Sequence, residues 1–575
     1  MPAIASPVTL IVLSIGSAAL YLAYRAILPK PIAGIPYNKD AAGKLLGDVP
    51  EMIRYVLRTK RIFCWLTSLT TRHQSPIVQA FTRPGGLPWV VITDPFECQD
   101  ILLRRIKDFD RAEFFGEFVG GIMPHQHSHY LSTDAQFKNN RKLVNHLMAP
   151  TFINEISAPE VYSSTLNLIK LWKLKCKMAY GRPFSAHHDI TFASLDSIFA
   201  SSFGLVEIDS NTFQRLKKVD ENEMEVPDDV DTALSFPEHC PPDIFSAILT
   251  LAESVSDTQL SPAPALTSWI LRCFPYMRNA KAIKDKFIRD RVDEGIELID
   301  NGVTTQPKSA IHSVLLRERE LATKDGRQPD YHNNAIADEF FGFMTAGYDT
   351  SATTIAWGVK MLTDNPAVQV KLRDTLRNVF PDAAQDKRSL SYQELSGANI
   401  PYLDGVVDEV LRHSNSIGFV ARQAQHDTTV LGHHIPKGTN IWLMANGPGY
   451  LEPNMSLDDQ QRSLGARKES KSALTGLWDD NDIAKFLPER WLELDPDTGV
   501  EKYNSMAGPS LPFGMGLRGC YGKRLALQVL RIHFALIVWH FELLPTPVGL
   551  SGYEAVQKFA REPMQCYLRL KETDW

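Results

Sequence analysis

Apolar residues recur every three or four positions along most of the chain, a period typical of α-helices packed on a core. The clearest helical segments are 134–147, 190–203, 280–301, 332–362, 402–413 and 521–540. Strand-like runs are short, and they lie at 89–93, 428–431, 440–443 and 566–570. No internal repeat is evident. This pattern predicts a large, mainly α fold with a small β region.

The start of the chain follows a different pattern. Residues 1–24 carry no charged side chain, and 8–24 is a nearly continuous apolar run, about the minimum length that crosses ~30 Å of hydrocarbon. Basic residues follow this run at Arg25 and Lys30, and none precede it. This favours a membrane anchor with a cytosolic main domain over a signal peptide or a buried helix. We expect one transmembrane helix within residues 1–28, a Pro-rich hinge over 29–40 and one large domain over 41–575.

The composition fits a globular protein, since 44% of the 575 residues are hydrophobic and 22% are charged. The net charge of −6 argues against nucleic-acid binding, which normally needs a strong basic excess. The seven cysteines are scattered and include no CxxC pair, so they predict free thiols in a reducing compartment. Residues 455–475 are polar with little periodicity, and we expect a long surface insertion there.

One cysteine stands in an unusual setting, the stretch PFGMGLRGCYGKRLA at residues 512–526. Four glycines surround Cys520, and a segment predicted to be a buried helix follows. Free N–H groups and the dipole at a helix start stabilise a thiolate, the form of cysteine that binds a metal. Gly522 lets something flat and large approach the backbone. A single cysteine presented in this way suits the proximal thiolate of a haem. The alternative is a buried structural cysteine in a glycine-rich turn.

The pattern Phe513-Gly-x-Gly-x-Arg518-x-Cys520-x-Gly522 resembles the haem-binding loop of the cytochrome P-450 family at every defining position. The resemblance implies that Cys520 is the axial iron ligand of haem b. It also implies that Phe513 packs beside the ligand and that Arg518 pairs with a haem propionate. It covers the chain from about residue 35 onward and implies the mainly α haem-thiolate fold of that family.

A Glu-x-x-Arg pair, Glu409 and Arg412, lies on a predicted helix, where this spacing puts both side chains on one face. It precedes FLPERW at residues 486–491, which resembles the PERF-type segment of the family. In the family, the arginine of that segment joins the Glu–Arg pair and braces the haem loop. The resemblance assigns this structural role to Arg490 with Glu409 and Arg412.

The segment AGYDTS, residues 346–351, resembles the oxygen-binding part of the family's long central helix. The resemblance implies that Gly347 leaves room for dioxygen, that Thr350 offers a hydroxyl there, and that Asp349 passes protons from solvent. Taken alone, such a segment would more often be a patch of small residues between packed helices. Its position upstream of Glu409 favours the catalytic interpretation.

Two further arginines are expected at the haem propionates. Arg141 follows Phe137 at the spacing of the family's Trp-x-x-x-Arg, with phenylalanine replacing the tryptophan and its indole N–H. Arg422 matches the arginine after the Glu-x-x-Arg helix that usually meets a propionate. The alternative for both is an exposed surface arginine.

The resemblance implies a monooxygenase that inserts one oxygen atom from O2 into a C–H or C=C bond and reduces the other to water. The chain carries no flavin or nicotinamide motif, so electrons from NADPH are expected through NADPH–cytochrome P-450 reductase, with cytochrome b5 as a second candidate donor. Lys138, Lys142, Lys523 and Arg524 are candidates for a basic docking face. The alternatives are a haem-thiolate isomerase or dehydratase without a reductase, and a non-catalytic haem sensor. The Asp349–Thr350 pair speaks against both.

The predicted anchor, FLPERW and the 455–475 insertion together resemble fungal microsomal enzymes, which predicts a single-pass protein of the endoplasmic reticulum membrane. Candidate substrate-wall segments are 113–130, 236–263, 341–344 and 416–420. Phe, Ile and Met recur in several of them. We therefore expect a lipophilic substrate from secondary metabolism, such as a terpenoid, polyketide or indole.

Overall fold

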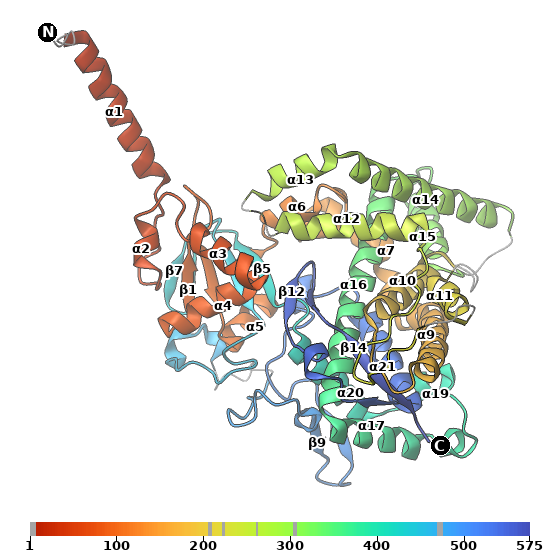
Figure 1. Cartoon of the computed structure of the whole chain (residues 1–575). Coiled ribbons are helices and arrows are strands. Elements are labelled where there is room, and N and C mark those ends of the chain that lie inside the picture. The colour runs from red at the N-terminus through yellow and green to blue at the C-terminus, as the bar shows by residue number, and fades with distance from the viewer. Residues whose placement is uncertain are drawn as a thin grey trace. The chain divides into compact units, whose positions relative to one another are not determined.

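The computed structural model describes residues 7–204, 210–220, 225–259, 261, 263–302, 307–467 and 475–574. The chain forms two compact units. The first comprises Met1–Ala112 and Phe419–Ala473, and the second comprises Glu113–Gly418 and Leu474–Trp575. The described residues are mostly helical with several small sheets, as the apolar pattern predicts (Figure 1).

The first unit is built on a five-stranded sheet with the strand order β1-β2-β8-β5-β3. Strands β2 and β8 run parallel, and the other neighbours are antiparallel. Phe63 packs on this sheet, with its ring centroid 3.9 Å from that of Phe419. The elements of this unit are α1 (Pro7–Ile27), α2 (Lys39–Ala42), α3 (Val49–Thr59), α4 (Ile62–His73), β1 (Ile77–Ala80), β2 (Trp89–Ile92), α5 (Pro95–Leu103), β3 (Phe109–Asp110), β5 (Phe419–Ala424), β6 (Thr428–Val430), β7 (His433–Ile435) and β8 (Asn440–Met444).

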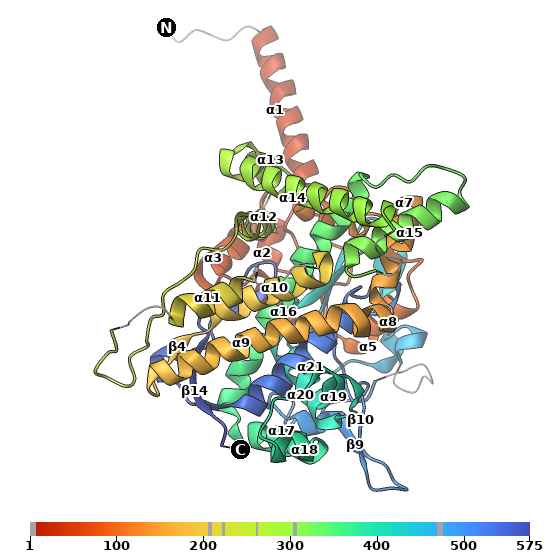
Figure 2. The ribbon, with the colours of Figure 1, turned by 90° about the vertical axis from the view of Figure 1, so that its right-hand side faces the viewer.

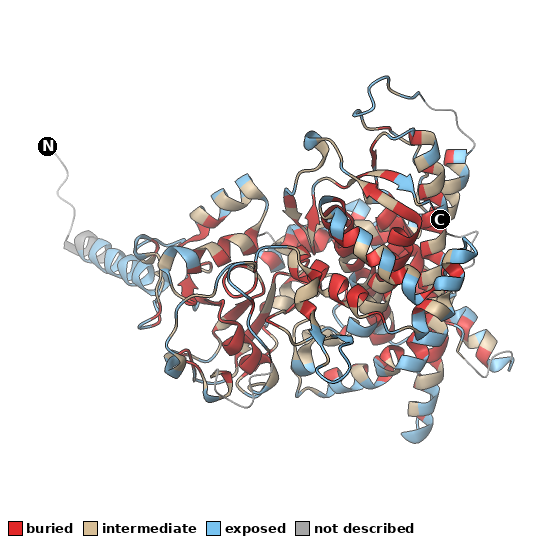
Figure 3. Ribbon diagram, turned by 90° about the horizontal axis from the view of Figure 1, so that it is seen from below, coloured by how far each residue is buried: buried red, intermediate tan, exposed pale blue. Residues whose placement is uncertain are grey.

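Helix α1 occupies the segment predicted to be an anchor, and its described side chains are largely exposed (Figure 3). They include the large apolar residues Leu20, Tyr21 and Leu22. In the part of the chain that the structure describes, no helix has the length and apolar character needed to cross a membrane. The transmembrane anchor therefore stays a prediction.

Two segments of the first unit are more firmly held than their sequences suggest. In the Pro-rich hinge, the Ile32 amide donates to Oε1 of Gln79 at 2.8 Å, and Nε2 of Gln79 donates to the Ile35 carbonyl at 2.7 Å. Within the predicted 455–475 insertion, Arg462 is buried and its Nη2 lies 2.6 Å from Oδ2 of Asp94. The expectation of a plain surface insertion is therefore corrected around Arg462. Residues 468–474 lie outside the described residues.

The second unit is a helical bundle centred on α16 (Asn334–Asp364), which packs against α10, α20 and α21 (Figures 1 and 2). Small residues allow this close packing: a Cβ added at Gly358 of α16 would lie 2.3 Å from Cζ of Phe534. The other helices are α6 (Phe114–Val119), α7 (Ala135–Val144), α8 (Pro150–Phe152), α9 (Ala158–Ala179), α10 (His187–Phe203), α11 (Asn211–Asp220), α12 (Asp243–Gln259), α13 (Pro264–Cys273), α14 (Pro275–Asp300), α15 (Ala310–Lys324), α17 (Pro366–Val379), α18 (Pro381–Gln385), α19 (Tyr392–Gly397), α20 (Pro401–Ser414) and α21 (Lys523–His540).

Short antiparallel sheets complete the second unit. They are the three-stranded sheet β11-β14-β4 and the pairs β9–β10 and β12–β13. The strands are β4 (Phe184–Ser185), β9 (Leu492–Leu494), β10 (Glu501–Tyr503), β11 (Phe541–Leu544), β12 (Ala555–Gln557), β13 (Arg561–Pro563) and β14 (Tyr567–Glu572). Strand β13 contacts α16, so the hairpin β12–β13 lies against the central helix.

Candidate active site

The cysteine loop turns sharply before α21. Gly514 and Gly516 have φ angles of 58° and 69°, a left-handed region that favours glycine. The amide of Cys520 donates a hydrogen bond of 2.6 Å to the Phe513 carbonyl, which closes the loop. Helix α21 begins at Lys523, two residues later than predicted, with Gly522 as its N-cap residue. The loop therefore presents Cys520 just ahead of a helix N-terminus.

The surroundings of Cys520 have two opposing effects on the pKa of its thiol. Surrounding protein atoms remove much of its hydration, which raises the pKa of the thiol above its usual value. The amides of Gly522 and Lys523 and the charges of Lys523 and Arg141 work against this rise in pKa. Cys520 nevertheless keeps an exposed surface. A metal ion bound there would deprotonate the thiol.

Two predicted propionate partners, Arg518 within the loop and Arg141 on α7, each lie against an aromatic ring. The guanidinium of Arg518 lies 4.2 Å from the ring centroid of Phe137 and donates to the carbonyl of Tyr130. The guanidinium of Arg141 lies 4.4 Å from the ring centroid of Tyr521. Phe137 thus supports Arg518 by stacking, in the position where the family has a tryptophan. The two cations are held where an anionic group next to Cys520 could meet them.

A buried glutamate that the sequence analysis missed fixes the segment preceding α7. Glu339 of α16 accepts from the His127 amide at 2.6 Å, and its Oε2 lies 2.7 Å from Nδ1 of His127. Nδ2 of Asn140 on α7 donates to the same carboxylate at 2.9 Å. These bonds tie the loop of His127, and with it Phe137 and Arg141, to the central helix. No pattern around Glu339 indicated this role, because acidic residues on helices are usually exposed.

The predicted oxygen-binding residues lie on the half-open face of α16. Between Ala335 and Thr363, a stretch that the structure describes in full, the residues that are not buried are Ala337, Phe343, Ala346, Gly347, Asp349 and Thr350. The Thr350 hydroxyl donates to the Ala346 carbonyl at 2.8 Å. Although the residue is only partly buried, loss of hydration at its carboxyl group, whose Oδ2 is shielded from solvent, and the charge of Glu562 raise the pKa of Asp349 to about 7. A carboxyl group with that pKa exchanges protons near neutral pH.

Gly347 has a packing role that the sequence analysis did not predict. A Cβ added at this position would lie 2.7 Å from Cδ1 and 3.0 Å from Cγ1 of Ile198 on α10. The missing side chain therefore admits helix α10, and its role in leaving room for dioxygen stays a prediction. Of the predicted wall segment 341–344, Phe341 and Met344 are fully buried, and Phe343 is half-buried.

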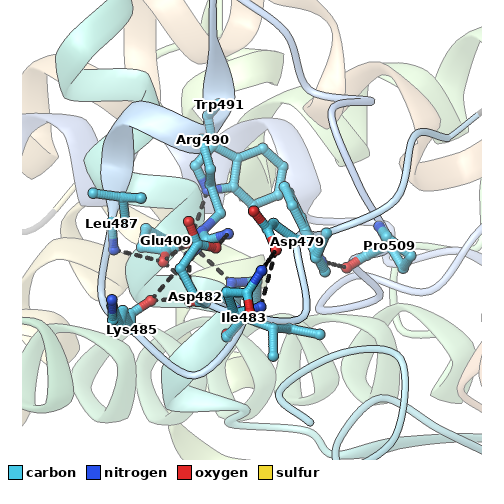
Figure 4. Close-up of polar contacts among 12 residues, drawn as sticks. Glu409, Asp479, Asp482, Ile483, Lys485, Leu487, Arg490, Trp491 and Pro509 are labelled. Atoms are coloured by element: carbon cyan, nitrogen blue, oxygen red, sulfur yellow. Dashed lines mark hydrogen bonds and ion pairs between the residues drawn. The ribbon is translucent and has the colours of Figure 1, made fainter. Parts of the chain in front are cut away.

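The predicted Glu–Arg–Arg trio is assembled and buried (Figure 4). Glu409 lies 2.7 Å from Nη2 of Arg412 and 3.1 Å from Nε of Arg490. Trp491 donates its indole N–H to Glu409 at 2.9 Å, and Asp482 pairs with Arg490 at 2.9 Å. Burial alone would raise the pKa of Glu409, but the bonds from Arg412 and His413 lower it well below its usual value. Trp491, the last residue of the FLPERW segment, is a further member of this network, and the sequence analysis did not predict its role.

The remaining predicted residues are not members of this network. Arg422 belongs to the first unit, where it is buried in β5, and its role at a propionate stays a prediction. Lys138 and Lys142 are exposed on α7, and Lys523 and Arg524 are exposed at the start of α21. These two helix segments are neighbours, because Tyr521 donates to the Val144 carbonyl and Arg524 donates to the Met148 carbonyl.

The residues around Cys520 supply the charges and the metal ligand that a haem needs. A Cβ at Gly522 would meet no atom within 4 Å, so open space lies beside the cysteine loop. Leu517 of the same loop is 58% exposed, although it is apolar. Arg141 and Arg518 supply cations for two carboxylates, and Cys520 supplies one soft ligand. In the described part of the chain, no group of three His, Cys, Asp or Glu residues could hold a metal ion by itself.

Comparison with known proteins supports this interpretation. The model of the cytochrome P-450 family matches residues 68–450 and 478–554. The cytochrome P-450 monooxygenase TRI13 of Fusarium sporotrichioides is 36% identical over 580 residues, covering 97% of this chain and 98% of the relative. A cytochrome P-450 monooxygenase of Pestalotiopsis microspora is 35% identical, covering 96% of each chain.

A shorter relative and a solved structure add to these matches. The Hps1-dma1 cluster cytochrome P-450 monooxygenase cyp3.1 of Dothistroma septosporum is 35% identical and covers 50% of this chain and 96% of the relative. The crystal structure of the cytochrome P-450 CYP102L1 aligns with a TM-score of 0.66 at 18% identity, covering 95% of this chain and 99% of that one. The structural match establishes the fold.

Proposed function

The chain belongs to the cytochrome P-450 family of monooxygenases, and from that premise we propose that it oxidises a small lipophilic substrate with a haem bound through Cys520. In this proposal Cys520 is the iron ligand, and Arg141, Arg518 and Arg422 hold the propionates. When bound, the haem supplies the activation of O2 and the oxidation of a C–H or C=C bond. The isomerase, dehydratase and sensor alternatives are set aside, because the relatives are monooxygenases.

The protein's own residues hold the cysteine loop in position and supply protons at the face of α16. Glu409, Arg412 and Arg490 hold the segment before the cysteine loop in place through buried charge pairs. Asp349 has a pKa of about 7, so it can take up and release protons at the half-open face of α16. Thr350 lies one position further on and offers a hydroxyl at that face. Its donor bond to the Ala346 carbonyl keeps the hydroxyl oriented until another acceptor is present.

The observation that carries the proposal is the setting of Cys520, which keeps an exposed surface beside open space and between two arginines held on aromatic rings. The test is turnover under 18O2 with NADPH and a reductase, using lipophilic candidate substrates. We expect NADPH-dependent oxygen uptake and a product that carries one 18O atom, with the second 18O atom in water. Product whose added oxygen comes from water would refute the proposed reaction.

We propose that a reductase docks on the basic face formed by Lys138, Lys142, Lys523 and Arg524. All four are exposed, and they lie on the two neighbouring helix segments next to the cysteine loop. Neutralising the four charges should slow the first electron transfer at low salt and weaken its dependence on ionic strength. Neutralising exposed lysines of α14, such as Lys281 and Lys286, is the matched control. An unchanged rate in the four-fold variant would contradict this docking face. NADPH as the source of electrons and cytochrome b5 as a second donor belong to the same proposal.

We also propose attachment to the endoplasmic reticulum membrane through the N-terminal segment, with the catalytic domain in the cytosol. The exposed apolar side chains of α1 support this. Deleting residues 1–28 should move the protein from the carbonate-resistant membrane fraction to the supernatant. Retention of the full-length protein in the supernatant would contradict attachment.

A substrate from secondary metabolism is proposed on two grounds. The relatives that match most of the chain come from fungi, and one shorter relative is named for a cluster. The half-buried Phe343 next to the oxygen-binding segment favours a lipophilic substrate. A terpenoid, polyketide or indole that accumulates on deletion of the enzyme would identify the class. A polar primary metabolite would contradict the proposal.

A further inference from the structure

Helix α7 and the cysteine loop each supply an aromatic ring that supports the other's arginine. Phe137 of α7 lies against Arg518 of the loop, with 4.2 Å between the guanidinium and the ring centroid. Tyr521 of the loop lies in the same way against Arg141 of α7, at 4.4 Å. A guanidinium over an aromatic face is held by attraction to the ring and by stacking on it. The positions of both cations therefore depend on the positions of these two rings.

The ring of His127 contacts both of these aromatic rings. Its centroid lies 6.1 Å from that of Phe137, with an angle of 62° between the two planes. It lies 5.9 Å from the centroid of Tyr521, with an angle of 75°. Both are edge-to-face arrangements, which aromatic pairs favour over a face-to-face sandwich. The supports of the two arginines thus meet at His127, although they come from different segments of the chain.

The central helix α16 holds His127 in turn. Oε1 of Glu339 accepts from the His127 amide at 2.6 Å, and Oε2 lies 2.7 Å from Nδ1 of the ring. Asp338, the preceding residue of α16, accepts from the His125 amide at 2.8 Å. Nδ2 of Asn140 donates both to Glu339 at 2.9 Å and to the His125 carbonyl at 2.7 Å. The backbone and the ring of His127 are both fixed, and the Glu339 side chain is only 4% exposed.

We propose that His127, held by Glu339, positions both Arg141 and Arg518 and thereby sets how tightly the protein retains its haem. His127 is a positioning residue, because it acts through the two aromatic rings and the arginines that they support. The proposal rests on the proposed function in taking these arginines as the partners of the haem propionates. The alternative is a histidine that only anchors its own loop, and its effect on haem retention would then be independent of the two arginines.

The test is the rate at which the ferric holoenzyme transfers haem to excess apomyoglobin. His127→Gln keeps a side chain that can donate to Glu339 but has no ring. It should raise the rate about tenfold, which corresponds to about 1.4 kcal/mol, the size of one charge-assisted hydrogen bond. It should also lower the reduction potential of the haem, because cations close to a haem favour its reduced, less positive form. The red-shifted band of the carbon monoxide complex should remain, since the Cys520 ligand is untouched.

Two variants separate the ring from the loop that carries it. His127→Phe keeps a ring between Phe137 and Tyr521, so it should raise the rate of haem transfer less than His127→Gln does. His129→Gln, in the same loop, is the matched control and should leave the rate unchanged. The His129 ring lies against α6, since a Cβ added at Gly116 would lie 3.3 Å from its Nδ1. Equal rates in His127→Phe and His127→Gln would contradict the role of the ring.

The decisive comparison repeats His127→Gln in Arg141→Gln and in Arg518→Gln. If His127 acts through the arginines, its effect on the transfer rate should shrink in each of these proteins, because part of what it positions is already absent. The same fold-change in all three proteins would overturn the proposal, and so would an unchanged rate in His127→Gln alone. Loss of the 18O result described above, with this comparison still as expected, would instead refute the monooxygenase reaction and leave the positioning role standing.

Discussion

Glu409→Gln is the substitution that most severely tests the buried network of Glu409, Arg412 and Arg490. The carboxylate accepts two bonds from Arg412 at 2.7 and 2.9 Å, one from Arg490 at 3.1 Å and one from Trp491 at 2.9 Å. Glutamine has nearly the same shape but only one acceptor oxygen, and its amide N–H groups would face other donors. Removing one partner from a buried charge network costs about 3–5 kcal/mol. We expect a loss of that size in the free energy of unfolding.

The assay is urea unfolding of the holoenzyme, followed by tryptophan emission, since Trp478 and Trp491 flank the network. The matched control is Glu489→Gln in the same segment. Glu489 pairs with Lys371 at 2.9 Å, but the two side chains are 37% and 42% exposed, so its loss should cost about 1 kcal/mol or less. If Glu409→Gln and Glu489→Gln lower the free energy of unfolding by the same small amount, the network does not brace this region.

The stability loss of Glu409→Gln should depend on pH. The pKa of Glu409 in the folded protein lies well below its ordinary value of 4.5. The stabilisation from this group is therefore fully present above pH 4.5 and is lost as the pH falls toward the folded-state pKa. The stability gap between wild type and Glu409→Gln should narrow as the pH is lowered from 5. A gap that widens on acidification would contradict the sign of the pKa shift.

Three further substitutions test separate contacts. Gly347→Ala should cost about 1–3 kcal/mol by overpacking against Ile198, and Gly347→Ala with Ile198→Val should recover part of the loss in the same urea assay; no recovery would refute the steric explanation. Thr350→Ala should raise hydrogen peroxide released per NADPH at the expense of product, and unchanged coupling would place the hydroxyl's role elsewhere. Arg462→Met should destabilise the protein by about 3–5 kcal/mol because it leaves Asp94 buried without its cation, and a loss near zero would show that this contact is not held in solution.

The mainly helical character of the chain and the positions of several long helices could be predicted from the apolar period alone, whereas α9 and α12 were not predicted. The segment predicted at 402–413 is α20, and the one predicted at 332–362 is α16. The Glu–Arg spacing also placed Glu409 and Arg412 on one face, because that geometry is local to a helix turn. What the spacing did not show is which contacts cross between elements.

The unforeseen contacts join residues far apart in the chain. Glu339 binds the loop of His127, and the Phe137 ring supports Arg518. No periodicity in the sequence encodes such pairs, since each depends on how two separate elements meet. The packing at Gly347 was unforeseen for a related reason, because its sequence neighbours do not reveal that Ile198 of α10 lies against it.

The central claim is that Cys520 is the iron ligand, and the absorption spectrum of the reduced carbon monoxide complex tests it most directly. The wild-type protein should show the red-shifted band of a thiolate-ligated haem, and Cys520→Ser should lose that band. Cys273→Ser, which changes another exposed cysteine, should keep it. A red-shifted band that survives in Cys520→Ser would contradict the assignment of the ligand.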